Sequence, residues 1–585
     1  MDKPWLKHYE PHVPEHINYP DMLLPQALKH SAEKYPERAA IIFKGARMSY
    51  AELDETVDRL AAALQQLGVA KGDRVAIHMP NCPQFVLAYY ATLRLGGIVV
   101  PCNPLYRAHE MVHQLNNSGA KIIFTLSNTY PLVHQIRGET ALRQVIVAQI
   151  KTYFPLHLRL LFGLLLEKKK GHYADIRGDP HTSWFQDLLK NVPPSPALVE
   201  LSGDDVAVLM YTGGTTGVPK GAELTHRNIF VNAYMCKVWL NSNDGQEVDM
   251  AQMPLFHAFG MTGAMNLSVL IAATMVLVPD PRDINDVIHT IQRFKPTIYP
   301  GVPMIYNSII NYPNIQKYDL SSIRNCFSGG AGLPREIQEK FEQLTGANVV
   351  EGYGLSESSP ITIGNPVTAG KRIGTIGLPW PDTDVKIVDA ESGTRILGTG
   401  EEGELCIRGP HIMRGYWNNP AETANTLQVD SADPNPQPWL YTGDIATMDS
   451  DGYFRIVDRK KDVIISGGGY KVFPREVEEL LYRHPSVREA AVVGIPYEKK
   501  GERVKAFVVL KPGEQVTADE IIQFCQKNLA AYKVPKFVEF RDVIPNTASG
   551  KPLRRQLRDE SIQAHAAAPV ATPALEVTAP ENVMP

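Results

Sequence analysis

Apolar runs alternate with amphipathic stretches along most of the chain, up to about Asp458. Residues 50–67 space their apolar positions with the period of a helix, and the apolar segment 74–78 that follows predicts a buried strand. Further strands next to helical segments are predicted at 122–126, 206–211, 297–300 and 348–351. This alternation favours an α/β fold with parallel strands, in which ligands usually bind at the loops that follow the strands.

The pattern changes after Asp458. Three glycines at 467–469 precede a helix that begins at Pro474. Strands at 490–496 and 504–510, a helix at about 518–531 and the apolar segment 538–544 complete a compact α+β unit. The chain is therefore predicted to have three parts: a large multi-subdomain N-terminal domain with mixed and parallel sheets (1–458), a small C-terminal domain (459–560) and a disordered Ala- and Pro-rich tail (561–585).

One apolar segment stands apart, at residues 154–166, with the sequence FPLHLRLLFGLLL and three lysines directly after it. A helix that crosses a bilayer needs about 20 apolar residues, so this segment is predicted not to span a membrane. Two interpretations stay open: a core or surface helix with a solvated charged end, and a helix that lies on a membrane surface. The N-terminal residues MDKPWLKHYEPHVPEH contain no apolar run of the kind that a secretory signal needs.

The composition of the chain argues against several classes of protein. The chain has 585 residues, of which 44% are hydrophobic and 21% charged, so a large buried core is available. The formal net charge of -4 argues against a nucleic-acid partner. The six cysteines are far apart and none forms a CxxC pair, which favours reduced thiols in a cytoplasmic protein over a zinc site or disulfide framework.

The strongest local signal is a glycine- and threonine-rich loop, YTGGTTGVPKG, at residues 211–221. Glycines let the backbone approach an anion, while hydroxyl and amide groups donate hydrogen bonds to its oxygens. Lys220 adds a positive charge. Because Pro219 precedes this lysine and Gly221 follows it, the loop lacks the Gly-Lys-Ser/Thr order of a P-loop NTPase. We predict a phosphate-binding loop of another kind.

Three more segments are of this type. They are SGGAGLP at 328–334, EGYGLSES at 351–358 and YTGD at 441–444. Each alone is more often a turn than a site, but the four together indicate one nucleotide site.

These four segments, in this order, resemble the adenylate-forming superfamily, which includes acyl-CoA synthetases, firefly luciferase and peptide-synthetase adenylation domains. The resemblance runs from about residue 10 to about residue 560 and is closest to bacterial long-chain fatty acid–CoA ligases. It is supported by NCPQ, GGIVVPCNPLY, GELCIRGPHIMRGYW, TGDIATMDSDGYFRIVDRKKD and PNTASGKPLRR. It implies the substrates ATP, a fatty acid and coenzyme A, with Mg²⁺ as metal.

The resemblance also implies residue roles in binding ATP. The β- and γ-phosphates are held by Thr212, Gly213, Gly214, Thr215, Thr216, Gly217 and Lys220. The adenosine site comprises Gly329, Gly330, Ala331, Glu351, Gly352, Tyr353, Gly354, Asp444 and Arg459, with Tyr353 stacked on adenine and the last two residues at the ribose. Ser356 stands where the family usually has threonine, and its hydroxyl reaches the α-phosphate. Glu357 and Thr216 hold Mg²⁺.

Four residues are implied in catalysis itself. Lys551 is the adenylation lysine, Glu357 binds the Mg²⁺ ion, and His257 lines the passage between the acyl and CoA sites. Lys461 is the hinge about which the small domain rotates between half-reactions. The chemistry explains the charges: a carboxylate and ATP are both anions, so positive charge must lie where they meet. The adenylate must be protected from water and then exposed to CoA, which requires a movable lid.

Several points stay open. Pro552 replaces the usual aliphatic residue after Lys551, and the run SGGGYKVFP has one glycine more than the family spacing. Alternative substrates are medium-chain or aryl acids, and an acyl-carrier protein is an alternative acceptor. A catalytically silent acyl or nucleotide sensor is the alternative of another class, although such a sensor is expected to lack Lys551 or Glu357. A homodimer, peripheral association with the inner face of the cell membrane and the biological pathway also stay open.

Overall fold

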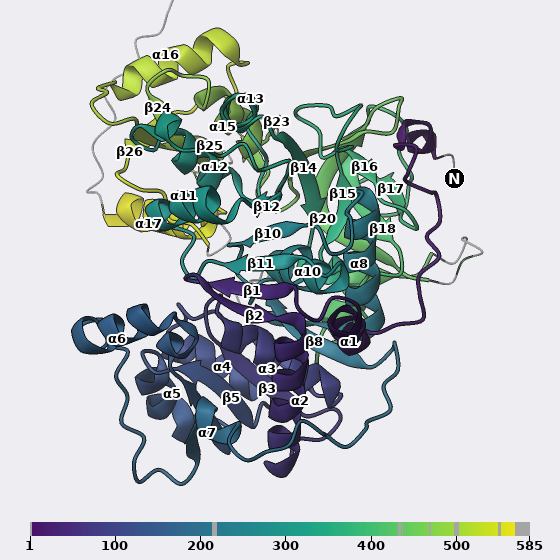
Figure 1. The fold of residues 1–585 in the computed structure, drawn as a ribbon. Helices are drawn as coiled ribbons and strands as arrows, with labels where there is room; N and C mark the ends of the chain where they lie inside the picture. Colours follow the sequence, from purple (N-terminus) through teal and green to yellow (C-terminus); the bar gives the residue numbers. More distant parts are fainter. Residues whose placement is uncertain are drawn as a thin grey trace, which may run out of the picture. The chain divides into compact units, whose positions relative to one another are not determined.

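The computed structural model describes residues 3–212, 219–430, 435, 437–466, 470–496, 502–547 and 551–567 (Figure 1). Its contacts divide the chain into a larger unit, which ends at Lys461 and also includes Lys551, and a smaller unit that begins at Asp462. Both units mix helices and sheets, which confirms the predicted α/β class with a large N-terminal part and a small C-terminal part.

The largest sheet of the larger unit has nine strands. In spatial order they are β16 (Leu378–Pro379), β15 (Ile361–Gly364), β14 (Asn348–Gly354), β13 (Asn325–Ser328), β12 (Ile298–Gly301), β10 (Val248–Ala251), β11 (Thr274–Leu277), β1 (Ala39–Phe43) and β2 (Ala46–Ser49). The six strands from β14 to β1 are parallel, and β2, β15 and β16 add antiparallel edges. The parallel strands are largely buried, as expected where helices cover a parallel sheet.

A second sheet has seven strands. They are β7 (Thr182–Trp184), β6 (Gln144–Ala148), β5 (Ile122–Leu126), β3 (Arg74–His78), β4 (Ile98–Pro101), β8 (Val206–Thr212) and β9 (Lys220–Thr225). Only the β8–β9 pair is antiparallel. Figure 1 shows α2 (Tyr50–Gln66), α3 (Pro83–Arg94), α4 (Ala108–Ser118), α5 (Tyr130–Ile136) and α7 (Phe185–Leu188) gathered around this sheet.

A third sheet of the larger unit is antiparallel. It consists of β17 (Asp384–Val388), β18 (Gly403–Arg408), β20 (Trp439–Met448), β19 (Leu427–Gln428) and β21 (Phe454–Arg459). Arg459 was predicted to begin the small domain, but its strand pairs with β20, so the larger unit extends to Lys461. The physical reason is the β20–β21 ladder, which holds the chain in this sheet beyond Asp458.

The remaining helices of the larger unit are short to medium in length. They are α1 (Leu24–Lys34), α6 (Leu156–Leu165), α8 (His226–Trp239), α9 (Ala258–Gly260), α10 (Leu267–Leu270), α11 (Ile284–Phe294), α12 (Pro303–Ile310), α13 (Arg335–Thr345) and α14 (Pro420–Thr426). The π-helix η4 (Met261–Asn266) joins α9 to α10, and the 3₁₀ turn η6 (Ser356–Ser358) follows β14. Other 3₁₀ turns are η1 (Pro4–His8), η2 (Arg137–Glu139), η3 (Ile150–Tyr153) and η5 (Ile315–Lys317).

The smaller unit has its own sheet and apolar core. Its strands are β23 (Tyr470–Val472), β22 (Ile464–Ser466), β25 (Glu502–Leu510), β24 (Val487–Pro496) and β26 (Phe537–Phe540), and its helices are α15 (Pro474–Leu481), α16 (Ala518–Asn528) and α17 (Arg554–Ala567). The tail was predicted to begin at 561, but α17 continues through Ala567. Leu557 and Ser561, one helical turn apart, are both buried, and this packing extends the helix. Residues 568–585 lie outside the described part.

Most of the predicted elements are confirmed. The predicted helix 50–67 is α2, which begins with a reciprocal cap in which Ser49 accepts from the Glu52 amide and Glu52 accepts from the Ser49 amide. The strands predicted at 74–78 and 122–126 have the bounds of β3 and β5, and those at 206–211, 297–300 and 348–351 correspond to β8, β12 and β14. All six cysteines are buried thiols.

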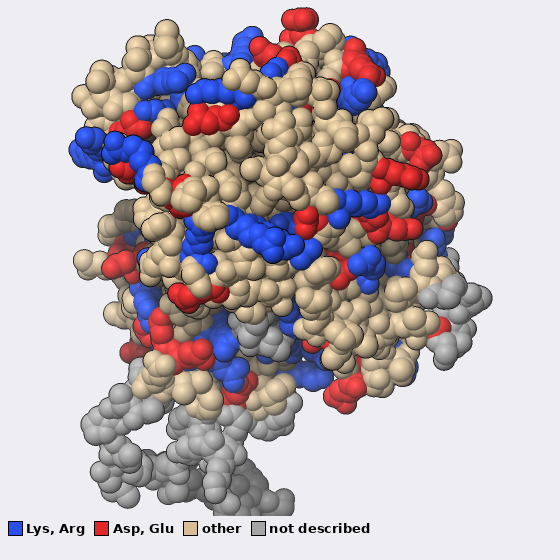
Figure 2. Space-filling model, turned by 90° about the horizontal axis from the view of Figure 1, so that it is seen from below, with Lys and Arg blue, Asp and Glu red and all other residues tan. Residues whose placement is uncertain are grey.

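Among the described residues, every helix falls short of the length and apolar content that a membrane span needs. Lys and Arg side chains alternate with Asp and Glu on the face drawn in Figure 2, between broad uncharged areas. This mixture agrees with the small net charge of the sequence.

Candidate active site

The parallel strands of the nine-stranded sheet bring several predicted site residues to one edge. β10 leads to His257, β13 leads to Gly329, Gly330 and Ala331, and β14 carries Tyr353 near its end. Since parallel strands end at the same edge, these segments, far apart in sequence, form one surface. The Gly329 amide donates to the Gly301 carbonyl oxygen at the end of β12 over 3.1 Å, which fixes the start of this loop.

Two glycines of this edge are required by the backbone. Gly330 has φ +81°, a conformation that side chains with a Cβ rarely adopt. A Cβ on Gly354 would lie 1.8 Å from the Pro360 carbonyl oxygen, because the chain turns back there from β14 into β15. These two glycines therefore allow a backbone conformation and a close backbone approach that a larger residue would prevent.

Tyr353, Asp444 and Arg459 form a hydrogen-bonded cluster. The Tyr353 hydroxyl donates to Oδ2 of Asp444 over 2.5 Å, and Nε of Arg459 lies 2.6 Å from Oδ1 of the same carboxylate. Burial and the Asp444 charge raise the pKa of Tyr353 well above its usual value, so the hydroxyl stays a donor. The β20–β21 register places Asp444 opposite Arg459, so the aspartate predicted at the ribose is held in a defined orientation.

Glu357 lies in the turn η6, directly after Ser356. Its Oε1 accepts from the Tyr416 hydroxyl over 2.8 Å, and its carbonyl oxygen accepts from the Met413 amide over 2.8 Å. The segment 413–416 therefore orients a carboxylate that is predicted to hold a metal. In the part of the chain that the structure describes, no group of three or more His, Cys, Asp or Glu side chains is arranged to hold a metal.

The glycine-rich segment joins the antiparallel strands β8 and β9. Thr212 ends β8 and Lys220 begins β9, whereas the predicted phosphate ligands Gly213, Gly214, Thr215, Thr216 and Gly217 lie outside the described residues. Nζ of Lys220 forms an ion pair with Glu422 and lies 5.6 Å from the centre of the Tyr416 ring. Lys220 thus has a carboxylate partner in this structure.

Lys551 and His257 have strongly shifted pKa values. Burial lowers the pKa of the Lys551 ammonium to about 8, and repulsion by Arg459 acts in the same direction, while Asp444 and Glu357 oppose the shift. Burial, followed by repulsion from Lys551, lowers the pKa of His257 to about 4, so this imidazole is neutral at pH 7. Shifts of this size are common at functional sites.

Two further predicted residues, Glu351 and Lys461, lie at a strand connection and at the boundary of the larger unit. The carbonyl oxygen of Glu351 accepts from the Asn365 amide over 3.0 Å, which belongs to the β14–β15 connection. Lys461 is the last residue of the larger unit before the boundary at Asp462. Its position at that boundary agrees with the hinge expected there, but rotation itself remains a prediction.

Two family profiles match the chain. One, described as AMP-binding enzyme, matches residues 28–417, and the other, described as AMP-binding enzyme C-terminal domain, matches residues 476–551. The chain belongs to the AMP-binding enzyme family.

The relatives of this AMP-binding enzyme match it over nearly the whole length. A long-chain-fatty-acid–CoA ligase of Bacillus subtilis (strain 168) is 42% identical over 568 residues, 96% of this chain and 99% of that protein. A protein of the same name from Escherichia coli O157:H7 is 38% identical over 574 residues, again 96% and 99% of the two chains. Among solved structures, the anthranilate CoA ligase AuaEII in complex with anthranoyl-AMP has a TM-score of 0.81 at 27% identity, covering 93% of this chain and 98% of that chain.

Three residues of this AMP-binding enzyme's site had no role assigned from sequence. Tyr416 contacts both Glu357 and Lys220, Glu422 pairs with Lys220, and Glu404 accepts from both the Gly443 amide (3.1 Å) and Nζ of Lys460 (2.8 Å). Tyr416 and Glu404 lie in the stretch 403–417, which supports the family resemblance. The resemblance in that stretch could have indicated that Tyr416 and Glu404 belong to the site. It could not indicate which residues they contact, because those residues are distant in sequence.

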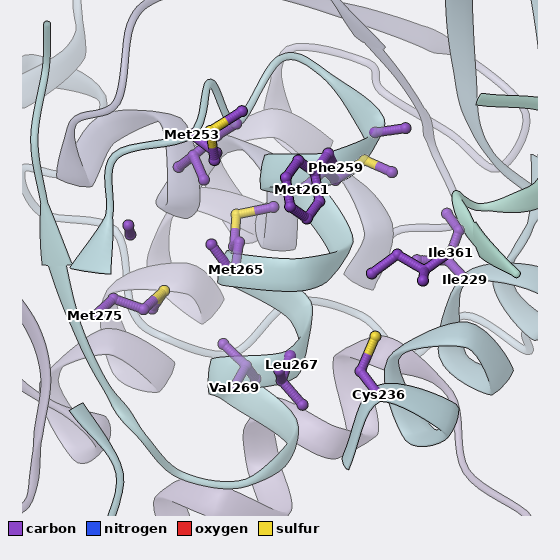
Figure 3. Packing of buried hydrophobic residues seen from close by; sticks show 14 of the residues in the cluster. Ile229, Cys236, Met253, Phe259, Met261, Met265, Leu267, Val269, Met275 and Ile361 are labelled. Atoms are coloured by element: carbon purple, nitrogen blue, oxygen red, sulfur yellow. The ribbon is translucent and has the colours of Figure 1, made fainter. Parts of the chain in front are cut away.

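An apolar wall follows His257 in the AMP-binding enzyme. Met261 and Met265 lie on η4 and are fully buried, and Figure 3 shows them with Met253 and Phe259 in one packed cluster. The segment 261–273 packs as part of the hydrophobic core of the larger unit. Methionine side chains are flexible and polarizable, so they fill irregular spaces in such a core.

Proposed function

We propose that this chain is a long-chain fatty acid–CoA ligase. It joins a fatty acid to ATP, releasing pyrophosphate and forming an acyl-adenylate, and then transfers the acyl group to the thiol of CoA, releasing AMP. The observation that carries the proposal is the 42% identity to a protein of that name over 96% of this chain. The arrangement of Tyr353, Asp444 and Arg459 beside the glycine loops supports the nucleotide part of it.

We assign the nucleotide roles that the family resemblance implies. Asp444 accepts hydrogen bonds from the ribose hydroxyls, with Arg459 at the same sugar. Gly329, Gly330 and Ala331 line one side of the adenine, and Tyr353 stacks on it. The segment from Glu351 to Gly354 completes this wall, and the Ser356 hydroxyl reaches the α-phosphate. Thr212, Lys220 and the residues between them hold the outer phosphates.

The residues present suit Mg²⁺. This ion commonly binds through one or two carboxylates together with substrate phosphates and water, so a single oriented carboxylate is sufficient. Glu357 is such a group, because the Tyr416 hydroxyl fixes one of its oxygens. We propose Glu357 and Thr216 as the protein ligands. When bound, the ion neutralises negative charge on the phosphate oxygens.

In the first step the fatty-acid carboxylate oxygen attacks the α-phosphorus of ATP. A bond forms between that oxygen and the phosphorus, and the bond to the pyrophosphate oxygen breaks with its electron pair. Negative charge increases on the α-phosphate oxygens during the attack. We assign the Lys551 ammonium to stabilise this charge, because a preorganised cation in a water-poor site is effective there.

In the second step the CoA sulfur attacks the acyl carbon and AMP leaves with the electron pair of the acyl–oxygen bond. The adenylate must be protected from water in the first step and be reached by CoA in the second. We propose that the smaller unit moves about Lys461 between the steps, with His257 beside the passage to the acyl carbon. The neutral state of His257 at pH 7 avoids a further positive charge there.

The acyl specificity is tested by a series of carboxylic acids. We expect AMP release in the presence of ATP, Mg²⁺ and CoA to increase from medium-chain to long-chain acids, because each buried methylene adds about 0.8 kcal/mol. A preference for benzoate or anthranilate would favour an aryl-acid ligase instead. AMP release that requires an acyl-carrier protein in place of CoA would identify the carrier protein as the acyl acceptor.

The pH dependence of adenylation tests the role of Lys551. The ammonium is present below a pKa of about 8 and is lost above it, so kcat/KM for adenylation should fall about tenfold per pH unit on the alkaline side. His257, with a pKa of about 4, does not titrate in this range. Pyrophosphate exchange at varied pH measures the effect. Lys551→Arg keeps its charge and should lose this alkaline fall, so an unchanged profile in that variant would assign the titration to another group.

We propose a cytoplasmic enzyme that works at the inner surface of the cell membrane, where its fatty-acid substrate partitions. The six buried thiols agree with a reducing compartment. A homodimer is the assembly that we would test first, by sedimentation velocity, since homodimers are the commonest oligomers.

A further inference from the structure

Helix α6 exposes leucines that a folded protein normally buries. Of its ten residues none is buried, and the exposed fractions of its leucines are 72% for Leu156, 59% for Leu160, 51% for Leu161, 83% for Leu164 and 64% for Leu165. Isolated exposed leucines are common on protein surfaces, but five on one short helix form a patch. Such a patch on a soluble protein usually marks a surface that contacts something else.

The helix is nevertheless anchored to the larger unit. Phe162 packs edge-on against Phe154 with 5.5 Å between the ring centres, and Phe154 in turn packs against Phe43 at 5.5 Å. At the C-terminal end, Nζ of Lys151 lies 2.6 Å from the Glu167 carboxylate. The exposed leucines are therefore held on the outer side of a packed helix.

Positive charge lies directly beside the leucines. Lys168, Lys169 and Lys170 are exposed and follow the helix, and Arg159 is exposed within it. The acidic residue of this stretch, Glu167, is already neutralised by Lys151. The segment thus offers an apolar face with a basic end, which is complementary to a surface that combines hydrocarbon with negative charge.

We propose that α6 docks this enzyme onto an anionic lipid bilayer. A helix of 10 residues is about 15 Å long, so it lies in the plane of the membrane surface instead of crossing it. The exposed leucines enter the boundary between headgroups and acyl chains, and the three lysines contact anionic headgroups. The suggested purpose of this docking, the delivery of fatty acids, rests on the proposed function. The membrane binding itself does not.

Vesicle sedimentation tests the proposal with the full-length protein and without ATP, CoA or fatty acid. The protein should bind vesicles that contain phosphatidylglycerol more tightly than vesicles of phosphatidylcholine alone. Leu160→Gln with Leu164→Gln should weaken this binding about tenfold or more, while glutamine preserves helix propensity. The control is Leu198→Gln with Ile396→Gln, which changes two exposed apolar residues outside α6 and should bind like the wild type.

A second variant separates charge from apolar contact. Lys168→Gln, Lys169→Gln and Lys170→Gln together should weaken binding to anionic vesicles by about fivefold for each lysine and leave binding to neutral vesicles unchanged. Thermal unfolding, and adenylate formation from a water-soluble medium-chain acid, should match the wild type in every variant.

Three results would overturn the proposal. One is that the wild type does not sediment with anionic vesicles, and another is that both variants bind as the wild type does. The third is that the leucine variant dissociates a dimer in sedimentation velocity without affecting vesicle binding, which would make α6 a contact between two copies. Since binding is measured without substrates, its failure is distinct from failure of the ligase proposal, which the acid series tests.

Discussion

Replacement of Lys551 by alanine is expected to abolish acyl-adenylate formation while thioester formation from supplied acyl-adenylate continues. The ammonium is the protein cation assigned to the α-phosphate during attack by the carboxylate. Losing one such preorganised partner costs about 3–4 kcal/mol of barrier, or roughly 10²- to 10³-fold in rate. Transfer to CoA begins after that charge has developed, so it does not need this lysine.

The two half-reactions must be measured separately in this variant. Fatty-acid-dependent pyrophosphate exchange reports the first, and consumption of synthetic acyl-adenylate by CoA reports the second. Lys527→Ala is a matched control, because Lys527 is an exposed lysine on α16 and alanine suits its helix. Normal exchange in the Lys551→Ala variant would contradict the assignment, and equal loss of both half-reactions would indicate a structural role.

The second large effect is expected for Glu357→Gln. The amide oxygen of glutamine can still accept from the Tyr416 hydroxyl, so the orientation of the side chain is preserved while its charge is removed. If Glu357 holds Mg²⁺, kcat for adenylation should fall roughly 10²- to 10³-fold. The Mg²⁺ concentration for half-maximal rate should increase as well.

Magnesium titrations of pyrophosphate exchange measure both quantities. Tyr416→Phe is the complementary variant, because it removes the hydrogen bond and keeps the carboxylate. It should have a smaller effect on kcat and retain most of the metal affinity. An unchanged Mg²⁺ requirement in the Glu357→Gln variant would show that residues other than Glu357 bind the metal.

Local signals in the sequence were enough for much of the fold. Residues 49–66 contain both the helical period and the capping residues Ser49 and Glu52, so helix α2 could be predicted with nearly correct bounds. The C-terminal ends of the larger unit and of helix α17 could not be predicted in this way. They depend on the pairing of β21 with β20 and on the packing of Leu557, which are long-range contacts absent from any short window.

In the site, too, local patterns could be recognised from the sequence but long-range contacts could not. Gly330 and Gly354 could be recognised because a glycine-rich loop is a local pattern with a direct physical meaning. Tyr416 could not be paired with Glu357 in advance, because 59 positions separate them and only the folded chain brings them together. The ion pair of Lys220 with Glu422 was likewise hidden, so the lysine was predicted as a phosphate ligand without its competitor.

Both carboxylate oxygens of Asp444 are already engaged, one by Tyr353 and the other by Arg459. Each carboxylate oxygen keeps a further lone pair, so the ribose that we propose for this site would add its hydrogen bonds to an aspartate that is already held in place. The net gain from each such bond is modest, because a ribose hydroxyl gives up a hydrogen bond to water when it binds. Without a nucleotide, the buried Asp444 charge bears no penalty of an unpaired group, because Arg459 and the Tyr353 hydroxyl neutralise and orient it.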